Sequence, residues 1–282
     1  MAVEQLTEEE NWSGPMGDRW LANLDRFESM IGEVGEAVLA EADFQPGERV
    51  VDIGCGGGAN SLQIAAKVAP QGSVTGLDIS APLIEACEAR AKAAGVTNAS
   101  FVAGDAGAIT PPGAPFDHLF SRFGVMFFTD PYAAFANMHG FLKPGAKLTF
   151  ACWGPPDQNP TFGAIGAVVK RFTDTPPVPP RTPSPVAFAE PDYVQDILTR
   201  AGFKDIAVKP WRGHSYIGGK GASPEAALTF ATESMPSVRA FDELAPEQKT
   251  AARKDLLEVF SRSHGPEGVK FDAMVWMVSA RA

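Results

Sequence analysis

The chain has 282 residues, of which 45 % are hydrophobic, so it can bury one sizeable core as a single domain. Its formal net charge of −10 disfavours nucleic acid and anionic membranes as partners, because binding to phosphates depends on Lys and Arg. Its three cysteines lack metal-ligand spacing, the first residues lack a signal peptide's cationic start, and no apolar run reaches about 18 residues. We therefore expect a cytoplasmic protein without a metal site.

The first expected element is an amphipathic helix within residues 16–34. Trp20, Leu24, Phe27 and Ile31 follow one another at spacings of four, three and four residues, which places them on one helix face. This helix would belong to an N-terminal helical cap, residues 1–45. The pattern fits equally a helix packed on the sheet edge and a lid over a site.

Residues 46–153 alternate short apolar runs with helical patterns. The runs have few charges, which is typical of parallel strands covered on both faces. The alternation predicts βαβ units and a doubly wound sheet. The expected strands cover residues 48–54, 73–79, 99–105, 116–122 and 146–153, and the expected helices 59–69, 81–95 and 130–142.

The second half of the chain is less regular. Six prolines between positions 176 and 185 lead us to expect no regular structure over residues 154–191. Beyond them, the pattern predicts a helix over 192–201, a strand over 203–211, helical structure within 223–263 and a final strand over 269–280.

The run VVDIGCGGG, residues 50–58, places a glycine turn directly after the first strand. A P-loop is excluded, because no Lys or Arg occurs between positions 50 and 66. Gly54, Gly56 and Ala59 match the dinucleotide fingerprint GxGxxA, with Asp78 26 positions after Asp52. A carboxylate at Asp52 would repel a pyrophosphate and would suit a ligand with cationic groups, such as the sulfonium and ammonium of S-adenosylmethionine.

Taken together, the motifs resemble those of class I S-adenosylmethionine-dependent methyltransferases. After the glycine turn come GLDIS at 76–80, VAGDA at 102–106, FDHLFSRFGVMFF at 116–128, LKPGAKLTF at 142–150 and AGF at 201–203. The resemblance covers about residues 30–210 and the last strand. Its general look is that of small-molecule methyltransferases of the ubiquinone-biosynthesis type.

The resemblance implies one α/β domain over residues 1–282. Its Rossmann-like sheet would have seven strands, mostly parallel, with the C-terminal strand inserted antiparallel beside strand five or six. Residues 46–153 would form the cofactor-binding core. Residues 154–191 and 218–265 would be insertions at the acceptor site, after strands five and six.

The resemblance also implies a site for S-adenosylmethionine. Asp78 would accept both ribose hydroxyls, and Ile79 would lie against the adenine. Asp105 would accept from the adenine amino group, and the Ala106 N–H would reach a ring nitrogen. The other residues expected at the cofactor are Trp20, Asp52, Gly54, Cys55, Gly56, Ser121, Arg122 and Phe123.

Methyl transfer from a sulfonium is an in-line displacement, which alignment and exclusion of water can promote without a general base. The sequence assigns no catalytic residue, and His214 and Tyr216 are the candidates for a base. An aromatic-rich set outside the core predicts a small, apolar or aromatic acceptor: Trp12, Trp20, Trp153, Asn159, Phe162, Phe188 and Trp211.

Several alternatives stay open on the sequence. A nicotinamide-dependent oxidoreductase would also explain the GxGxxA match, and a chain that binds the cofactor without transferring its methyl group would carry the same motifs. The acceptor and its methylated atom, O, N or C, are not determined. Neither is the oligomeric state, for which a monomer and a homodimer both remain open.

Overall fold

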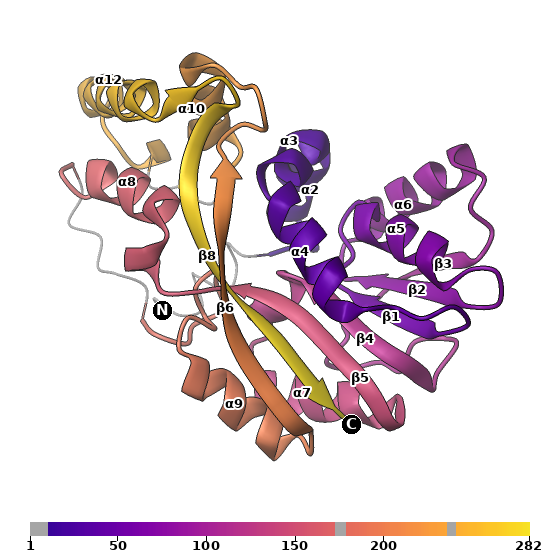
Figure 1. Ribbon diagram of the computed structural model, residues 1–282. Helices are drawn as coiled ribbons and strands as arrows, with labels where there is room; N and C mark the ends of the chain where they lie inside the picture. The colour runs from indigo at the N-terminus through magenta and orange to yellow at the C-terminus, as the bar shows by residue number, and fades with distance from the viewer. Residues whose placement is uncertain (1–10, 173–178, 236–240) are drawn as a thin grey trace.

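The computed structural model describes residues 11–172, 179–235 and 241–282, and one twisted sheet organises them (Figure 1). Its strand order is β3-β2-β1-β4-β5-β8-β6, and the short β7 pairs with β8 beside this path. The strands are β1 (Arg49–Ile53), β2 (Ser73–Asp78), β3 (Ala99–Ala103), β4 (Phe116–Arg122), β5 (Leu142–Trp153), β6 (Lys204–Tyr216), β7 (His264–Gly265) and β8 (Gly268–Arg281).

The strand directions confirm the predicted topology. β1 to β5 pair in parallel, whereas β8 runs antiparallel to both of its neighbours, β5 and β6. Val278 of β8 lies opposite Phe150 of β5 on one side and Val208 of β6 on the other. The final strand therefore joins strands five and six, and all strands except β7 and β8 present their carboxyl ends at the same edge.

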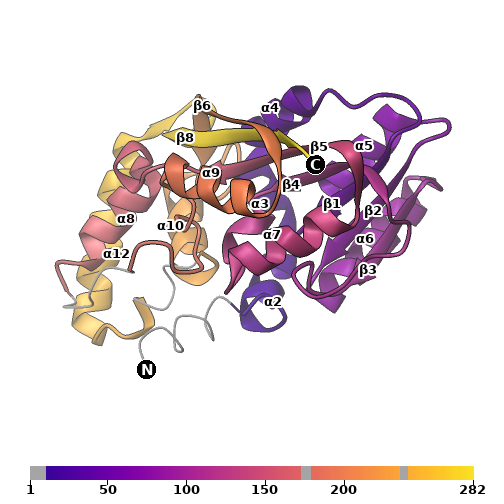
Figure 2. The ribbon, with the colours of Figure 1, turned by 90° about the horizontal axis from the view of Figure 1, so that it is seen from below.

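Helices cover both faces of the sheet. α4 (Gly32–Ala42), α5 (Ala59–Val68) and α6 (Ala81–Ala93) lie on one face, and α7 (Pro131–Gly140) and α9 (Pro191–Arg200) lie on the other (Figures 1 and 2). α7 begins where the Asp130 carboxylate accepts a hydrogen bond from the Ala133 N–H at 3.0 Å. α6 is followed by Gly95 at a φ of 67°, the left-handed conformation that glycine adopts without strain.

The long β6–β8 ribbon extends beyond the parallel strands and carries a group of helices (Figure 2). They are α8 (Pro160–Val169), α10 (Pro224–Glu233) and α12 (Pro246–Arg262). α8 corrects the expectation that residues 154–191 lack regular structure: its residues other than Thr161 are apolar or glycine, and its single proline occupies the first turn, where no N–H is needed. The expectation for Pro176 and Pro177 lies outside the described residues.

The N-terminal segment also differs from the single helix predicted. It forms three helices, α2 (Pro15–Ala22), α3 (Leu24–Met30) and α4. The first break falls at Asn23, whose side-chain amide donates to the Arg19 carbonyl at 3.1 Å. Because the chain turns there, the Trp20 ring stacks on Phe27 with 4.1 Å between the ring centroids.

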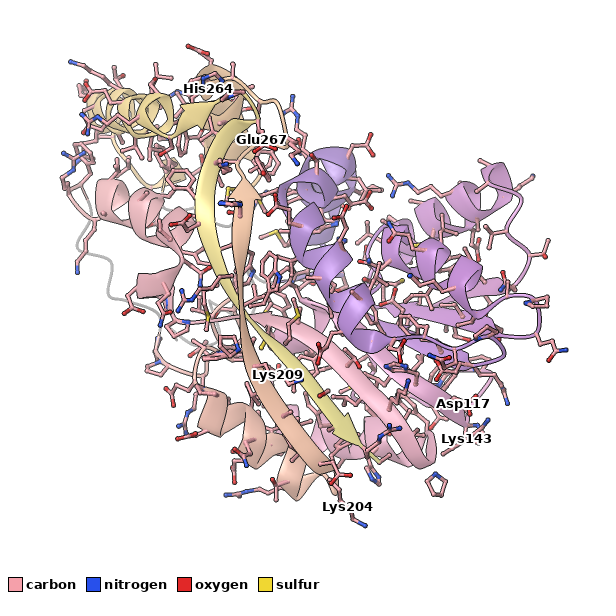
Figure 3. All side chains as sticks on the ribbon, viewed as in Figure 1. Asp117, Lys143, Lys204, Lys209, His264 and Glu267 are labelled. Atoms are coloured by element: carbon pink, nitrogen blue, oxygen red, sulfur yellow. The ribbon has the colours of Figure 1, made fainter. Side chains whose placement is uncertain are left out.

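Polar contacts link neighbouring strands at the amino ends of the parallel strands. Asp117 of β4 accepts hydrogen bonds from the Lys143 ammonium at 2.6 Å and from the Arg49 N–H at 3.0 Å (Figure 3). These contacts lie at the end of the strands opposite to the glycine turn, which follows the carboxyl end of β1.

Candidate functional site

A cavity of about 500 Å³ opens at the carboxyl ends of the parallel strands. This is the edge where open α/β sheets bind ligands, and the volume suits a small molecule. Residues at the ends of β1 to β4 and the N-terminal helices, whose Trp20 lies next to Gly56, form one end, and the segment after β5 forms the other. Its aromatic lining consists of Trp12, Trp20, Phe27, Phe123, Phe127, Phe128, Trp153 and Phe162.

The glycine turn forms the floor of the first end. Gly54 and Gly56 both have positive φ, at 65° and 55°, and both line the cavity. A side chain at Gly54 would place its Cβ 2.6 Å from the Gly124 Cα, so only glycine fits there. The turn thus keeps bare backbone against the cavity.

Asp78 ends β2 beside this turn. Its carboxylate accepts hydrogen bonds from the Gly56 N–H at 2.8 Å and the Ser80 N–H at 3.0 Å. Burial raises the pKa of Asp78, although these N–H groups oppose the shift. The two bonds fix the carboxylate's orientation and leave oxygen lone pairs for ligand hydroxyl groups.

Ile79 and the residues after β3 continue this end. Among the described residues, Ile79 is the one large hydrophobic side chain that is exposed, at 46 %, and it lines the cavity. Asp105 and Ala106 line the cavity as well, and the Asp105 carboxylate accepts from the Gly107 N–H at 2.7 Å. An apolar surface beside a fixed carboxylate suits a heteroaromatic ring with an amino group.

Arg122, the last residue of β4, supplies positive charge to the cavity. It is the one Lys or Arg among the described lining residues. Burial lowers its pKa, and the charges of Glu28 and Asp52 oppose this shift. Since it has no hydrogen bond or ion pair with any described residue, its guanidinium is available to a ligand carboxylate.

Three predicted cofactor residues lie outside the cavity lining. Asp52 is 2 % exposed and accepts from the Ser61 hydroxyl at 2.6 Å. The Ser121 hydroxyl donates to the Ile53 carbonyl at 2.7 Å. Cys55 packs with Ile84 and Cys87 in a small buried cluster.

The two candidate bases also lie outside the cavity. Glu33 of α4 accepts from the Tyr216 hydroxyl at 2.7 Å and from the His214 N–H at 3.0 Å. Burial and Glu33 raise the pKa of Tyr216, which keeps the hydroxyl protonated. Because side chains alternate along a strand, these contacts leave Ser215 between them directed to the other face, where it lines the cavity.

The second end of the cavity combines predicted and unpredicted residues. Of the expected acceptor-site set, Trp12, Trp20, Trp153 and Phe162 line the cavity, whereas Asn159, Phe188 and Trp211 do not. Trp20, which was also expected at the cofactor, lies next to Gly56 of the glycine turn. Asn159 instead donates to the Met274 carbonyl and accepts from the Met274 N–H, both at 2.9 Å. The sequence did not single out Met30, Thr161, Ser215 and Met235, whereas Pro183 and Pro185 belong to the proline-rich segment expected at the acceptor site.

The described residues have two further properties that bear on the function. None of their helices combines the length and apolar character needed to cross a membrane. Within the same residues, no group of three or more His, Cys, Asp or Glu side chains could hold a metal ion.

The side chains around the first end fit S-adenosylmethionine. Asp78 can accept from ribose hydroxyls, the exposed Ile79 offers an apolar surface to the adenine, and Arg122 can pair with the methionine carboxylate. The glycine turn contains no lysine or arginine that could bind a phosphate.

Comparison with known proteins agrees with this chemistry. Residues 50–145 match the family described as Methyltransferase domain. Demethylmenaquinone methyltransferase of Geobacillus kaustophilus is 26 % identical over 209 residues, which are 67 % of this chain and 87 % of the relative. Aklanonic acid methyltransferase of a Streptomyces species is 38 % identical over 117 residues, which are 42 % of this chain and 53 % of the relative.

The crystal structure of the Bacillus subtilis YcgJ protein shares the fold, with a TM-score of 0.59 at 17 % identity over 89 % of this chain and 98 % of the other. The motifs, the matched domain and the relatives favour a methyltransferase over the nicotinamide-dependent oxidoreductase that the GxGxxA match had kept open. The matched domain over residues 50–145 and these relatives support a class I S-adenosylmethionine-dependent methyltransferase.

Proposed function

We propose that this methyltransferase acts on a small, largely apolar metabolite with a flat ring system. The observation that carries the proposal is that one cavity contains polar cofactor-type residues at one end and a mostly aromatic lining at the other. The relatives support a small acceptor, since they are named for demethylmenaquinone and aklanonic acid.

We assign the first end of the cavity to S-adenosylmethionine, which supplies an electrophilic methyl group on sulfur when bound. Asp78 holds the ribose, Ile79 lies against the adenine and Asp105 accepts from its amino group. Arg122 pairs with the methionine carboxylate. The support for these roles is that all four side chains line the cavity and lie at or just after the carboxyl ends of β2, β3 and β4.

We assign the second end to the acceptor. Trp153 stacks on Phe123 at 4.6 Å between ring centroids and meets Phe162 edge to face at 5.1 Å. Such a rigid aromatic surface can align a flat ring and keep water from the methyl group. Since Glu33 engages both His214 and Tyr216 outside the cavity, we propose alignment without either residue acting as a base.

We also propose that separate segments of the chain cover the cavity, bind the cofactor and form the acceptor site. Residues 1–45 would cover the cavity, residues 46–153 would bind the cofactor, and 154–191 and 218–265 would complete the acceptor site. Trp20, Pro183 and Met235 support this division, since each brings one of the covering segments to the cavity. The three cysteines are free and buried, which suits the reducing cytoplasm we propose for the protein.

Two measurements test the proposed function. Calorimetry should show binding of S-adenosylhomocysteine and none of NAD, and the reverse result would overturn the cofactor assignment. A screen with methyl-labelled S-adenosylmethionine should then compare flat apolar acceptors, such as naphthols, with a small polar amine, such as ethanolamine. Label transfer to ethanolamine alone would contradict the proposed acceptor class.

A further inference from the structure

Two hydroxyl groups form a polar spot in the aromatic end of the cavity. Thr161 of α8 and Ser215 of β6 both line the cavity, and their hydroxyl oxygens are 2.9 Å apart. Both side chains are buried, at 4 % and 1 % exposure. We call Thr161 and Ser215 the hydroxyl pair.

The sheet order separates the hydroxyl pair from the cofactor residues. Asp78 ends β2, near one edge of the sheet, whereas Ser215 lies near the end of β6, which is the opposite edge strand. Thr161 precedes Phe162, whose ring packs against Trp153. The hydroxyl pair therefore belongs to the acceptor end of the cavity.

The hydrogen bonds of the pair leave one proton unused. Each hydroxyl has one proton to donate and two lone pairs to accept with. One hydroxyl donates to the other, and neither makes another hydrogen bond with a described residue. The second proton is thus free to bond to a ligand atom with a lone pair, in surroundings where a buried polar group gains much from a partner.

Contacts on the far face of β6 hold Ser215 in place. The His214 N–H and the Tyr216 hydroxyl, on either side of it in the chain, both donate to the Glu33 carboxylate of α4. Thr161 is held by the first turn of α8, which begins at Pro160. Both hydroxyls come from regular elements, so their separation does not depend on a loop.

We propose that the hydroxyl pair donates a hydrogen bond to a carbonyl or hydroxyl oxygen of the acceptor and so selects oxygenated rings over hydrocarbon rings of the same shape. This inference rests on the proposed function and adds that the apolar acceptor carries an oxygen at this position. An acceptor without the oxygen would leave the second proton of the pair buried without a partner.

The test uses a matched pair of ligands and the protein saturated with S-adenosylhomocysteine. The ligands are 1-tetralone, which carries a carbonyl oxygen, and tetralin, the same bicyclic frame without it. The double variant T161V/S215A removes both hydroxyls and keeps the side chains similar in size. The control T75V/S100A removes another Thr–Ser contact, 3.4 Å long, which joins β2 to β3 outside the cavity lining.

Calorimetry should show that T161V/S215A lowers the affinity for 1-tetralone relative to tetralin by about three- to tenfold, the usual worth of one hydrogen bond. T75V/S100A should leave the ratio unchanged. An unchanged ratio in T161V/S215A, or an equal fall in the control, overturns this inference and leaves the proposed function standing. If neither ligand binds the wild-type protein, the proposed acceptor class fails and the inference with it.

Infrared spectroscopy tests the hydrogen bond without any variant. The carbonyl stretch of ¹³C-labelled 1-tetralone should lie at lower frequency in the wild-type protein than in a hydrocarbon solvent. A stretch at the hydrocarbon position would overturn the inference even if T161V/S215A did not fold.

Discussion

Replacing Asp52 by Asn removes one buried carboxyl group at the end of β1. This side chain accepts from the Ser61 hydroxyl at 2.6 Å, a contact that an amide oxygen of the same size can keep. Burial raises the pKa of Asp52 to about 7; the Ser61 hydrogen bond and the charge of Arg122 oppose the shift, and the charge of Asp78 adds to it. The substitution therefore removes a titrating group with little change in shape.

The direction of the pH effect on the free energy of unfolding follows from the protonation of Asp52 in the folded and in the unfolded chain. At pH values between the unfolded pKa of about 3.9 and the folded pKa of about 7, the folded chain holds a proton on Asp52 that the unfolded chain has released. The free energy of unfolding of the wild-type protein therefore falls as pH rises through this window and levels off above it. At about 1.4 kcal/mol per pH unit well below the folded pKa, the loss from this group between pH 5.5 and pH 8 comes to about 2 kcal/mol.

Urea unfolding of the wild-type and D52N proteins at several pH values measures this loss. The window starts above the sequence pI of about 4.9, where the chain is most prone to precipitate. Groups other than Asp52 titrate in both proteins, so the difference between the two free energies isolates the buried proton. A difference that stays constant from pH 5.5 to pH 8 would refute the reasoning.

Three further outcomes are expected. Asp78→Ala should weaken S-adenosylhomocysteine binding about tenfold to a few hundredfold in calorimetry, because it removes charge-assisted hydrogen bonds. Asp117→Asn alters a strand carboxylate at the other end of the sheet and should leave the affinity unchanged; an equal loss in both variants would count against the ribose role. Glu33→Ala should lower the free energy of unfolding by about 1–3 kcal/mol, since the buried Tyr216 hydroxyl loses its acceptor, and adding Tyr216→Phe should restore part of the loss in urea unfolding. No recovery in the double variant would contradict that explanation. Deleting residues 1–28 should leave a core that binds S-adenosylhomocysteine weakly and transfers methyl groups poorly, because it removes aromatic lining. Normal turnover would exclude the lid role, whereas a truncated chain that cannot fold would favour a structural one.

The sequence predicted best what depends on local pattern. The alternation of apolar runs and helices predicted a doubly wound parallel sheet, and the family resemblance implied the antiparallel final strand beside strand five or six; the structure confirms both. Gly54, Asp78, Ile79 and Asp105 lie at or within two residues of strand ends, and the carboxyl ends of parallel strands meet at one edge. Their position at the cavity could therefore be predicted from the sequence.

The sequence missed other features for different reasons. Asn23 interrupts the N-terminal helix through its bond to Arg19, although the apolar spacing around it suits a continuous helix. The proline content of residues 154–191 obscured α8, whose residues other than Thr161 are apolar or glycine. Thr161 and Ser215 are 54 positions apart and meet only because the fold brings the end of β6 next to the start of α8. Nothing in the local sequence around Thr161 or Ser215 indicates that either residue lines the cavity.

The placement of β8 has a consequence for how the chain folds. β5 and β6 do not pair with each other, because each pairs with β8, which follows β6 in the chain by about 50 residues. Until Gly268–Arg281 has left the ribosome, the edges of both strands have no partner in the sheet, and open edges invite pairing with other chains. The nascent protein thus depends on a late, long-range step to close its sheet, and variants that weaken β8 should aggregate during synthesis more readily than variants that weaken β3 at the opposite edge.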